Sequence, residues 1–158
     1  MEINGKVMII TGGASGIGAA CTRAFAAKGA KMVVADLDEA GAKSVAEEVG
    51  GLGVPCDVGN EDSVNDLVAR AVYTFGAVDI FFSNAGIATG GNPLETPVDV
   101  WNHQWQVNVM AHVFAVRAVL PQMLERGSGY LLHTASMAGI LTSHGNSTYA
   151  TTKHAVVG

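Results

Sequence analysis

The chain has 158 residues, of which 49% are hydrophobic, and its nine Lys and Arg against 14 Asp and Glu give a formal net charge of −5. This length suits a single domain, 1–158, with enough apolar residues to fill one core. The scarcity of basic residues argues against a nucleic-acid partner, because proteins that bind phosphate backbones concentrate Lys and Arg. The amino terminus lacks a basic leader and no apolar run is long enough to cross a bilayer, so we expect a soluble, cytoplasmic protein without membrane contact.

Five short apolar segments, bounded by Gly, Asp or Asn, are predicted to be buried strands. They are Lys6–Ile10, Lys31–Ala35, Leu52–Cys56, Val78–Ser83 and Tyr130–Ala135. Segments with apolar residues at helical spacing lie between them, so strands and helices alternate along the chain. This alternation, with right-handed crossovers, predicts a Rossmann-type α/β fold, a doubly wound parallel sheet in the order 3-2-1-4-5.

A longer helix is predicted to begin at Thr96 and to run to about Arg126. Thr96 would be its N-cap, Pro97 would take the first turn and Asp99 would complete a capping box.

Residues 11–18 join the first predicted strand to the helix that follows it, and three glycines stand in this segment. Gly12 can make the tight turn, Gly16 can admit a pyrophosphate and Gly18 can let the helix pack closely. Glycines at such spacing also occur in loops that bind nothing. The strand before them and the amphipathic helix after them favour a dinucleotide site, which Ile17 would also contact.

Asp36 follows directly on the second predicted strand, where a carboxylate can accept hydrogen bonds from both hydroxyls of an adenosine ribose but would repel a 2′-phosphate. The other interpretation makes Asp36 the cap of the next helix, although Asp38 is better placed for that. NADP would also need a cation near its 2′-phosphate. Ser15 and Leu37 occupy the two positions from which a basic side chain could most simply reach that phosphate. The pattern predicts NAD rather than NADP.

Tyr149 and Lys153 lie four residues apart on a helix predicted to begin near Ser147, so they share one face. A tyrosine can protonate the alkoxide left by hydride transfer to a carbonyl, and a fixed ammonium beside it favours the phenolate form. This pair alone is also common on surface helices. Ser136, directly after the fifth strand, favours a catalytic interpretation because its hydroxyl can meet the same substrate oxygen.

Taken together, these motifs resemble the short-chain dehydrogenase/reductase family over the whole chain. The residues that carry the resemblance, in this order and spacing, are residues 11–18, Asp36, Asn84-Ala85-Gly86, Ser136 and Tyr149-x-x-x-Lys153. The resemblance implies a reversible, NAD(P)-linked oxidation of a small-molecule alcohol to a ketone, with Tyr149 as general acid/base. Lys153 would favour the phenolate and hold the nicotinamide ribose, and Ser136 would orient the substrate.

The resemblance also implies a catalytic role for Asn108, as the anchor of a water that passes protons from Lys153. Asn is a poor residue for a helix interior. Asn108 shares a face with Trp101 and Trp105, which we expect to lie in the core, so an inward position is predicted for it as well.

Asp57 and Val58 follow the third predicted strand and complete the predicted cofactor contacts. Asp57 resembles the family residue that contacts the adenine amino group, but it could equally cap the turn that follows. The histidines are scattered without metal-ligand spacing, and Cys21 and Cys56 are expected to be free, buried thiols. No metal site is predicted.

Gly158, the last residue, falls within a predicted helix, whereas members of the family usually continue. We therefore expect the C-terminal strands and the substrate lid to be absent. A homodimer or homotetramer is expected if the chain were complete. A non-catalytic dinucleotide-binding module, or one completed by a partner, is the competing hypothesis.

Overall fold

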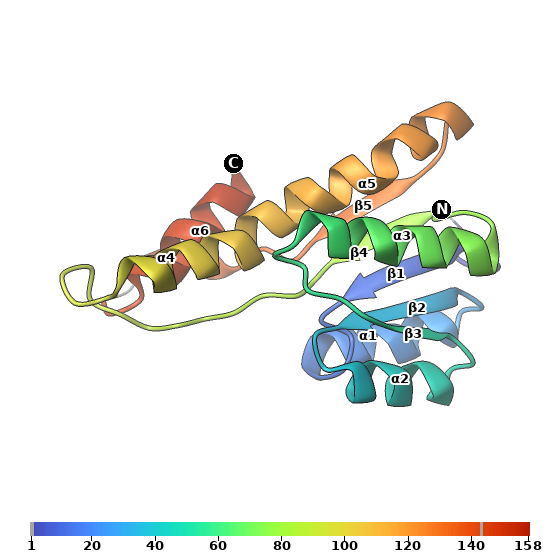
Figure 1. Ribbon diagram of the computed structural model, residues 1–158, viewed down its shortest axis with the longest axis horizontal. Coiled ribbons are helices and arrows are strands. Elements are labelled where there is room, and N and C mark those ends of the chain that lie inside the picture. The colour runs from blue at the N-terminus through green and yellow to red at the C-terminus, as the bar shows by residue number, and fades with distance from the viewer. Residues whose placement is uncertain (1, 143) are drawn as a thin grey trace.

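The computed structural model describes residues 2–142 and 144–158 of the chain. Its strands are all parallel and form one sheet in the order β3-β2-β1-β4-β5 (Figure 1), which confirms the predicted fold class and strand order. The strands are β1 (Val7–Thr11), β2 (Lys31–Asp36), β3 (Leu52–Pro55), β4 (Ile80–Ser83) and β5 (Tyr130–His133).

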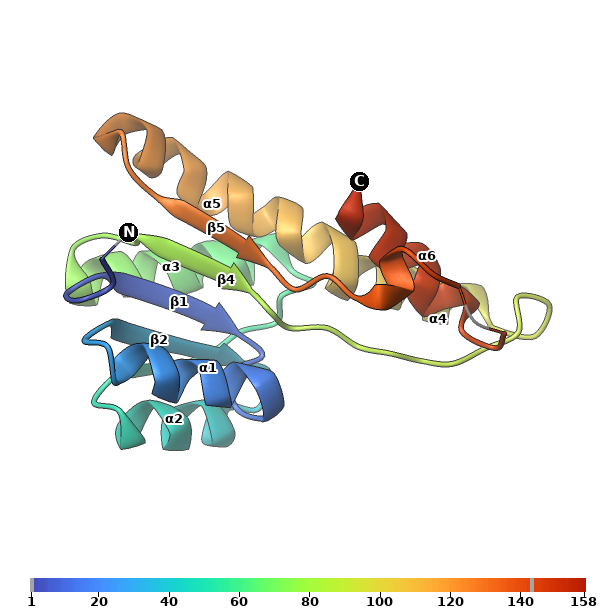
Figure 2. The same cartoon turned by 180° about the vertical axis from the view of Figure 1, so that it is seen from behind.

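The helices follow in the order that the alternating pattern predicts. They are α1 (Gly16–Ala26), α2 (Glu39–Glu48), α3 (Glu61–Phe75), α4 (Val98–Trp105), the π-helical turn η1 (Gln106–Met110), α5 (Ala111–Arg126), the 3₁₀ turn η2 (Met137–Gly139) and α6 (Ser147–Val157). Figure 2 shows α1 and α2 in front of the sheet, with α3 and α5 behind it.

Side chains of β1 alternate between two apolar cores, one on each face of the sheet. Met8 and Ile10 pack in the core that α1 and α2 cover, whereas Ile9 packs with Leu67 of α3 and Ala115 of α5. A strand that is covered on both faces has no polar side, and this explains why the strands read as continuous apolar runs in the sequence.

The long helix begins differently from the prediction. Pro97 takes the N-cap position, and the hydroxyl of Thr96 donates to the carbonyl of Asn92 at 2.8 Å. The carboxylate of Asp99 accepts from the amide of Val100, its own neighbour, at 2.9 Å. The predicted capping box was therefore wrong, because the turn that precedes the helix already uses the Thr96 hydroxyl.

α4, η1 and α5 form one continuous helical segment, Val98–Arg126, which confirms the predicted end. In the described part of the chain this 29-residue segment is the one that is long and apolar enough to cross a membrane. A stretch of 18 residues within it has a mean hydropathy of 1.4, and 33% of that stretch is buried. The criterion uses length and composition alone. Ala115 and Val119 of α5 are buried against the sheet, and core helices of this kind meet the same criterion.

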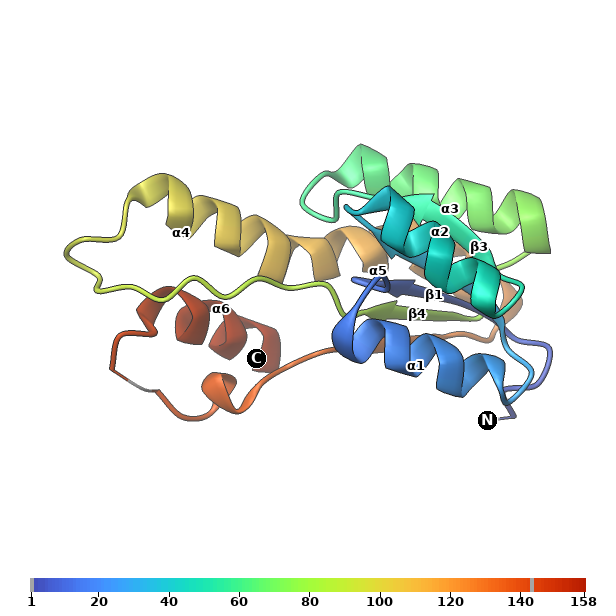
Figure 3. The ribbon, with the colours of Figure 1, turned by 90° about the horizontal axis from the view of Figure 1, so that it is seen from below.

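α6 lies beyond the carboxyl ends of the strands. It packs against η1, η2 and α4 (Figure 3), so it borders the edge of the sheet where parallel folds place their ligands.

Substitution of Leu67 by Ala is expected to lower the free energy of unfolding by about 2–5 kcal/mol, because the side chain is fully buried and its loss leaves a cavity. Urea denaturation measures the change. Tyr73 stands on the same helix and is 93% exposed, so Tyr73→Ala is the matched control and should change stability by less than about 0.5 kcal/mol. Equal losses in the two variants would contradict the assignment of Leu67 to the core.

Candidate active site

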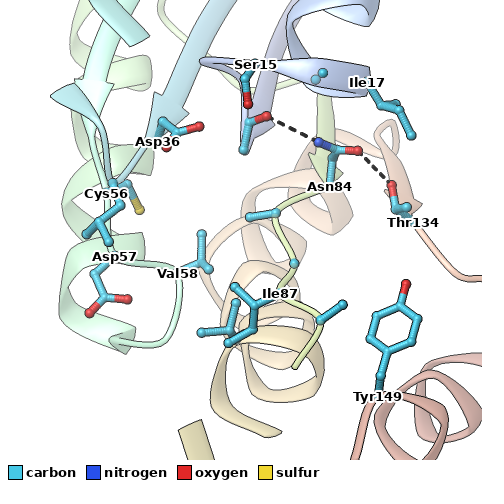
Figure 4. Close-up of a pocket in the computed structure, with 18 of the residues that line it drawn as sticks. Ser15, Ile17, Asp36, Cys56, Asp57, Val58, Asn84, Ile87, Thr134 and Tyr149 are labelled. Atoms are coloured by element: carbon cyan, nitrogen blue, oxygen red, sulfur yellow. Dashed lines mark hydrogen bonds between the residues drawn. The ribbon is translucent and has the colours of Figure 1, made fainter. Parts of the chain in front are cut away.

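A cavity of about 520 Å³ lies at the carboxyl edge of the sheet (Figure 4). It is lined by residues that follow the strands: Gly12 after β1, Leu37 after β2, Asp57 after β3, Asn84 after β4 and Thr134 after β5. Its volume falls within the range of small-molecule and cofactor sites.

Every residue predicted from the sequence to contact the cofactor lines this cavity. These residues are Gly12, Ser15, Gly16, Ile17, Gly18, Asp36, Leu37, Asp57, Val58, Asn84, Ala85, Gly86, Tyr149 and Lys153. Thr134 and His103 line it too, although the sequence analysis did not single them out. Thr134 was missed because the fifth strand was predicted to reach Ala135, whereas β5 ends at His133 and Thr134 directly follows it.

The glycine turn has the backbone geometry that its sequence predicts. Gly12 has a φ of 65°, which an L side chain rarely adopts, and a Cβ on Gly18 would meet the carbonyl oxygen of Gly12. A Cβ on Gly16 would meet nothing within 4 Å. Ser15 stands at the N-cap of α1 without a side-chain bond to the helix among the described residues. The first amides of α1 are therefore available to an anion.

Asp36 is held at the end of β2 by two backbone amides. One carboxylate oxygen accepts from Ala14 at 3.0 Å and the other accepts from Asp38 at 3.1 Å. Asp38 in turn accepts from the amide of Gly41 at 3.1 Å as the N-cap of α2. Asp38 thus caps the helix, as the sequence favours, and leaves the carboxylate of Asp36 to border the cavity.

Asp57 caps the turn after β3, accepting from the amide of Gly59 at 2.9 Å. This agrees with one of its two interpretations and does not prevent the other, because the second carboxylate oxygen has no such bond among the described residues. Cys56, also in the cavity wall, is a buried free thiol, and burial raises its pKa. Cys21 is free too, but only half-buried.

Asn84 connects the ends of three strands. Its backbone amide donates to the hydroxyl of Thr11 at 3.0 Å, and its side-chain amide donates to the carbonyls of Thr11 at 3.1 Å and Gly12 at 3.4 Å. Its side-chain oxygen accepts from the hydroxyl of Thr134 at 3.0 Å, as Figure 4 shows. β1, β4 and β5 are therefore tied at the floor of the cavity.

Lys153 is only 3% exposed, and its Nζ donates to the carbonyl of Thr134 at 2.9 Å. Burial lowers the pKa of this ammonium, because the charged form is the one that loses water. Its Nζ lies 5.7 Å from the centroid of the Tyr149 ring. Figure 4 shows the Tyr149 hydroxyl pointing from α6 into the cavity. Lys153 lines the same cavity, which the glycine turn also borders.

Asn108 lies in the π turn and is fully buried. Its side-chain oxygen accepts from the amide of Ile87 at 2.9 Å, and its Nδ2 donates to the carbonyl of Ile87 at 2.8 Å and to the hydroxyl of Thr152 at 3.0 Å. These bonds use all the donors of the side chain. The predicted inward position is confirmed, and π turns often mark functional sites.

Trp105 was predicted to share the buried face of Asn108 and does not, since it is 41% exposed. The residue one turn before Asn108 on this face is Gln104, which is fully buried. The π turn that begins at Gln106 has more residues per turn than an α-helix, so the spacing of an ideal α-helix fails here.

Ser136 does not line the cavity. Its hydroxyl accepts from the amide of Ala138 at 3.1 Å, as the N-cap of η2. The structure therefore brings Tyr149 and Lys153 together, and it places Ser136 on the adjoining turn.

A pair of histidines was not expected from the sequence. Nδ1 of His112, on α5, lies 2.8 Å from Nδ1 of His133, on β5, so one ring must donate and the other accept. Burial, His133 and Lys153 together lower the pKa of His112 to about 4, and burial also lowers the pKa of His133. Both rings are therefore neutral near pH 7.

The sequence profile of the family described as "short chain dehydrogenase" matches residues 6–158. The chain belongs to the short-chain dehydrogenase family. This membership confirms the resemblance that the motifs indicate.

The chain is 38% identical over 160 residues to 2,5-dichloro-2,5-cyclohexadiene-1,4-diol dehydrogenase of Sphingobium indicum, covering 98% of this chain and 64% of that protein. It is 38% identical over 161 residues to 3beta-hydroxysteroid dehydrogenase 2 of Eggerthella lenta, covering 98% and 62%. The crystal structure of a family member from Burkholderia phymatum in complex with NAD matches with a TM-score of 0.96 at 36% identity, covering 99% and 58%. The chain spans less than two thirds of the length of these relatives.

The histidine pair predicts a loss of stability in acid. The folded-state pKa of His112, about 4, lies below its ordinary value of 6.5, so the unfolded chain binds more protons as the pH falls from 6.5 toward 4. The free energy of unfolding should therefore fall between pH 7.5 and pH 5, and His112→Leu should reduce this fall by on the order of 1 kcal/mol. Urea denaturation at both pH values measures it. His103→Leu, at an exposed residue of α4, is the control, and an equal reduction there would refute the account.

Proposed function

We propose that this chain carries the cofactor site and catalytic residues of an oxidoreductase that transfers a hydride between NAD(H) and a secondary alcohol or ketone. The observation that carries the proposal is a single cavity with the glycine turn and Asp36 on one side and Tyr149 and Lys153 on the other. Family membership supports it, and so do the two relatives, which are named as dehydrogenases.

The residues around the cavity fit a dinucleotide from end to end. The free amides at the start of α1 would bind the pyrophosphate, with Gly12, Gly16 and Gly18 keeping the backbone clear of side chains. The carboxylate of Asp36 would accept from the adenosine ribose. Asp57 would meet the adenine, while Lys153 would reach the nicotinamide ribose.

NAD is preferred to NADP in this proposal. A 2′-phosphate would stand against the negative charge of Asp36, and the neighbouring Leu37, 77% exposed, offers no cation to offset it.

When bound, the nicotinamide supplies the hydride acceptor or donor. Tyr149 would move the proton, releasing it from the phenol to an alkoxide during reduction and taking it back during oxidation. Lys153, which the Thr134 carbonyl holds in place, would favour the phenolate by its positive charge. Asn108 would anchor the proton-carrying water through its backbone, since its side chain is already bonded.

Ser136 would orient the substrate oxygen by turning its hydroxyl away from the amide of Ala138. Its present bond is the observation that favours the second candidate, a dinucleotide-binding module without catalysis. Assembly into a homodimer or homotetramer in the cytoplasm is part of the first proposal.

Tyr149→Phe is expected to abolish turnover, because it removes the phenolic proton and leaves the ring. NADH absorbance with a panel of secondary alcohols and ketones measures the reaction. The panel includes ring-borne alcohols, since both named relatives are called after such compounds. We expect a loss of at least about a hundredfold in kcat, as is typical for general acid/base groups.

The control for this experiment is the dissociation constant of NADH, measured by fluorescence. It should be nearly the same in both proteins, because the phenolic oxygen serves the chemistry more than the binding. Turnover that survives Tyr149→Phe would overturn the assignment. NADH binding without turnover in either protein would favour the non-catalytic module.

Asp36→Asn is expected to raise the affinity for NADP relative to NAD by about tenfold, because it removes a negative charge and keeps the shape of the side chain. Calorimetric titration of both cofactors into the variant measures the ratio. Asp38→Asn removes a nearby carboxylate that caps α2, so it should leave the ratio unchanged. The same change of ratio in both variants would show that general charge, not Asp36, selects the cofactor.

A further inference from the structure

A set of hydrogen bonds among residues that do not line the cavity takes no part in the proposed chemistry. The hydroxyl of Thr89 donates to Oε1 of Gln104 at 2.8 Å, and the hydroxyl of Thr148 donates to the carbonyl of Thr89 at 2.8 Å. Gln104 and Thr148 are both fully buried. These three residues, the Thr89 clamp, connect α4 to the first turn of α6.

The clamp continues the contacts of Asn108. Nε2 of Gln104 donates to the carbonyl of Ile87 at 3.1 Å, the same carbonyl that accepts from Asn108 at 2.8 Å. Gln104 and Asn108 stand on successive turns of one continuous helix, and both point inward. Two neighbouring amide side chains thus hold the segment from Ile87 to Thr89: both bond to Ile87, and Gln104 also bonds to Thr89.

Among the described residues, hydrogen bonds tie the first turn of α6 to this segment, while α6 as a whole also packs against η1, η2 and α4. Asn146 occupies the N-cap without a side-chain bond to the helix in the described part of the chain. The amide of Gly91 donates to the carbonyl of Gly145 at 2.9 Å just before the helix begins. Within the helix, the bond from Thr148 to Thr89 holds the residue that directly precedes Tyr149.

We infer that Thr89, Gln104 and Thr148 are positioning residues, which hold the first turn of α6 so that the hydroxyl of Tyr149 faces the substrate. The inference rests on the proposed role of Tyr149 as general acid/base. Hydrogen bonds are directional, whereas apolar contacts are not. A clamp in which Gln104 and Thr148 are buried, although Thr89 is exposed, can therefore set the orientation of a helix. A small displacement of a reacting group lowers the rate far more than it lowers binding.

Thr148→Val tests the inference, because it deletes the donor and keeps the volume of the side chain. The kcat should fall by about fivefold or more, which matches the loss of one partly buried hydrogen bond. The dissociation constant of NADH should change by less than about twofold, since most of the proposed cofactor contacts lie on the segments that follow β1 to β4 and not on α6. Hydrogen exchange of the α6 amides from Ala150 onward, which bond within the helix, should become faster.

Thr148→Ser retains the hydroxyl and should restore both kcat and the exchange rates. The matched control is Thr151→Val, on the same helix, where an exposed threonine bonds to the carbonyl of Ser147 within the helix and to no other of the described residues. It should leave both readouts unchanged. Thr89→Val removes the hydroxyl that donates to Gln104 and should repeat the effect of Thr148→Val. It therefore serves as the second test if the Thr148→Val protein does not fold.

Unchanged kcat and exchange rates in Thr148→Val, or the same changes in Thr151→Val, would overturn the inference. Hydrogen exchange also separates it from the proposed function. If the unsubstituted chain shows no turnover, the function fails, yet faster exchange in Thr148→Val alone would still establish the clamp. Equal exchange rates in all variants would refute the proposed positioning role of the clamp.

Discussion

The bonds of one half-buried residue, Asn84, hold the site together. Its side chain contacts the carbonyl of Thr11 and the hydroxyl of Thr134, so the ends of β1, β4 and β5 are tied to one another. Thr134, fixed in this way, presents its carbonyl to Lys153. Hydrogen bonds thus connect the glycine turn, through Asn84 and Thr134, to Lys153 on α6, the helix that also carries Tyr149. Strand pairing alone would not fix these contacts, because it aligns the strands and not the loops that follow them.

α6 is held mainly by hydrogen bonds. Its buried residues are Thr148, Ala150, Thr152 and Lys153, and three of these four side chains are polar. Thr152 accepts from Asn108 in the π turn, and Thr148 donates to the segment after β4. α3, in contrast, is held by a stripe of buried apolar residues. Apolar packing stabilises without selecting one orientation, whereas hydrogen bonds need a narrow range of angles, so the polar helix is the one suited to a site that depends on geometry.

The sequence predicted those features that depend on residues close together in the chain. The glycine turn, the end of β2 at Asp36 and the N-cap at Asp38 all follow from local patterns, and the structure has them. Two local predictions failed for identifiable reasons. The hydroxyl of Thr96 was taken by the preceding turn, and the π turn moved Trp105 away from the buried face. Neither a competing local bond nor an extra residue in a helical turn leaves a clear signal in hydrophobic spacing.

The sequence by itself determined the fold, the strand order and most of the residues that line the cavity, because a parallel sheet brings every strand's carboxyl end to one edge whatever the details of packing. Only the tertiary structure decided which partners the side chains found there. Lys153 bonds to the carbonyl of Thr134, Ser136 bonds to its own turn, and His112 meets His133 across α5 and β5. A hydrogen bond forms over a narrow distance and angle, and such precision between distant segments arises only when the packed core sets their separation.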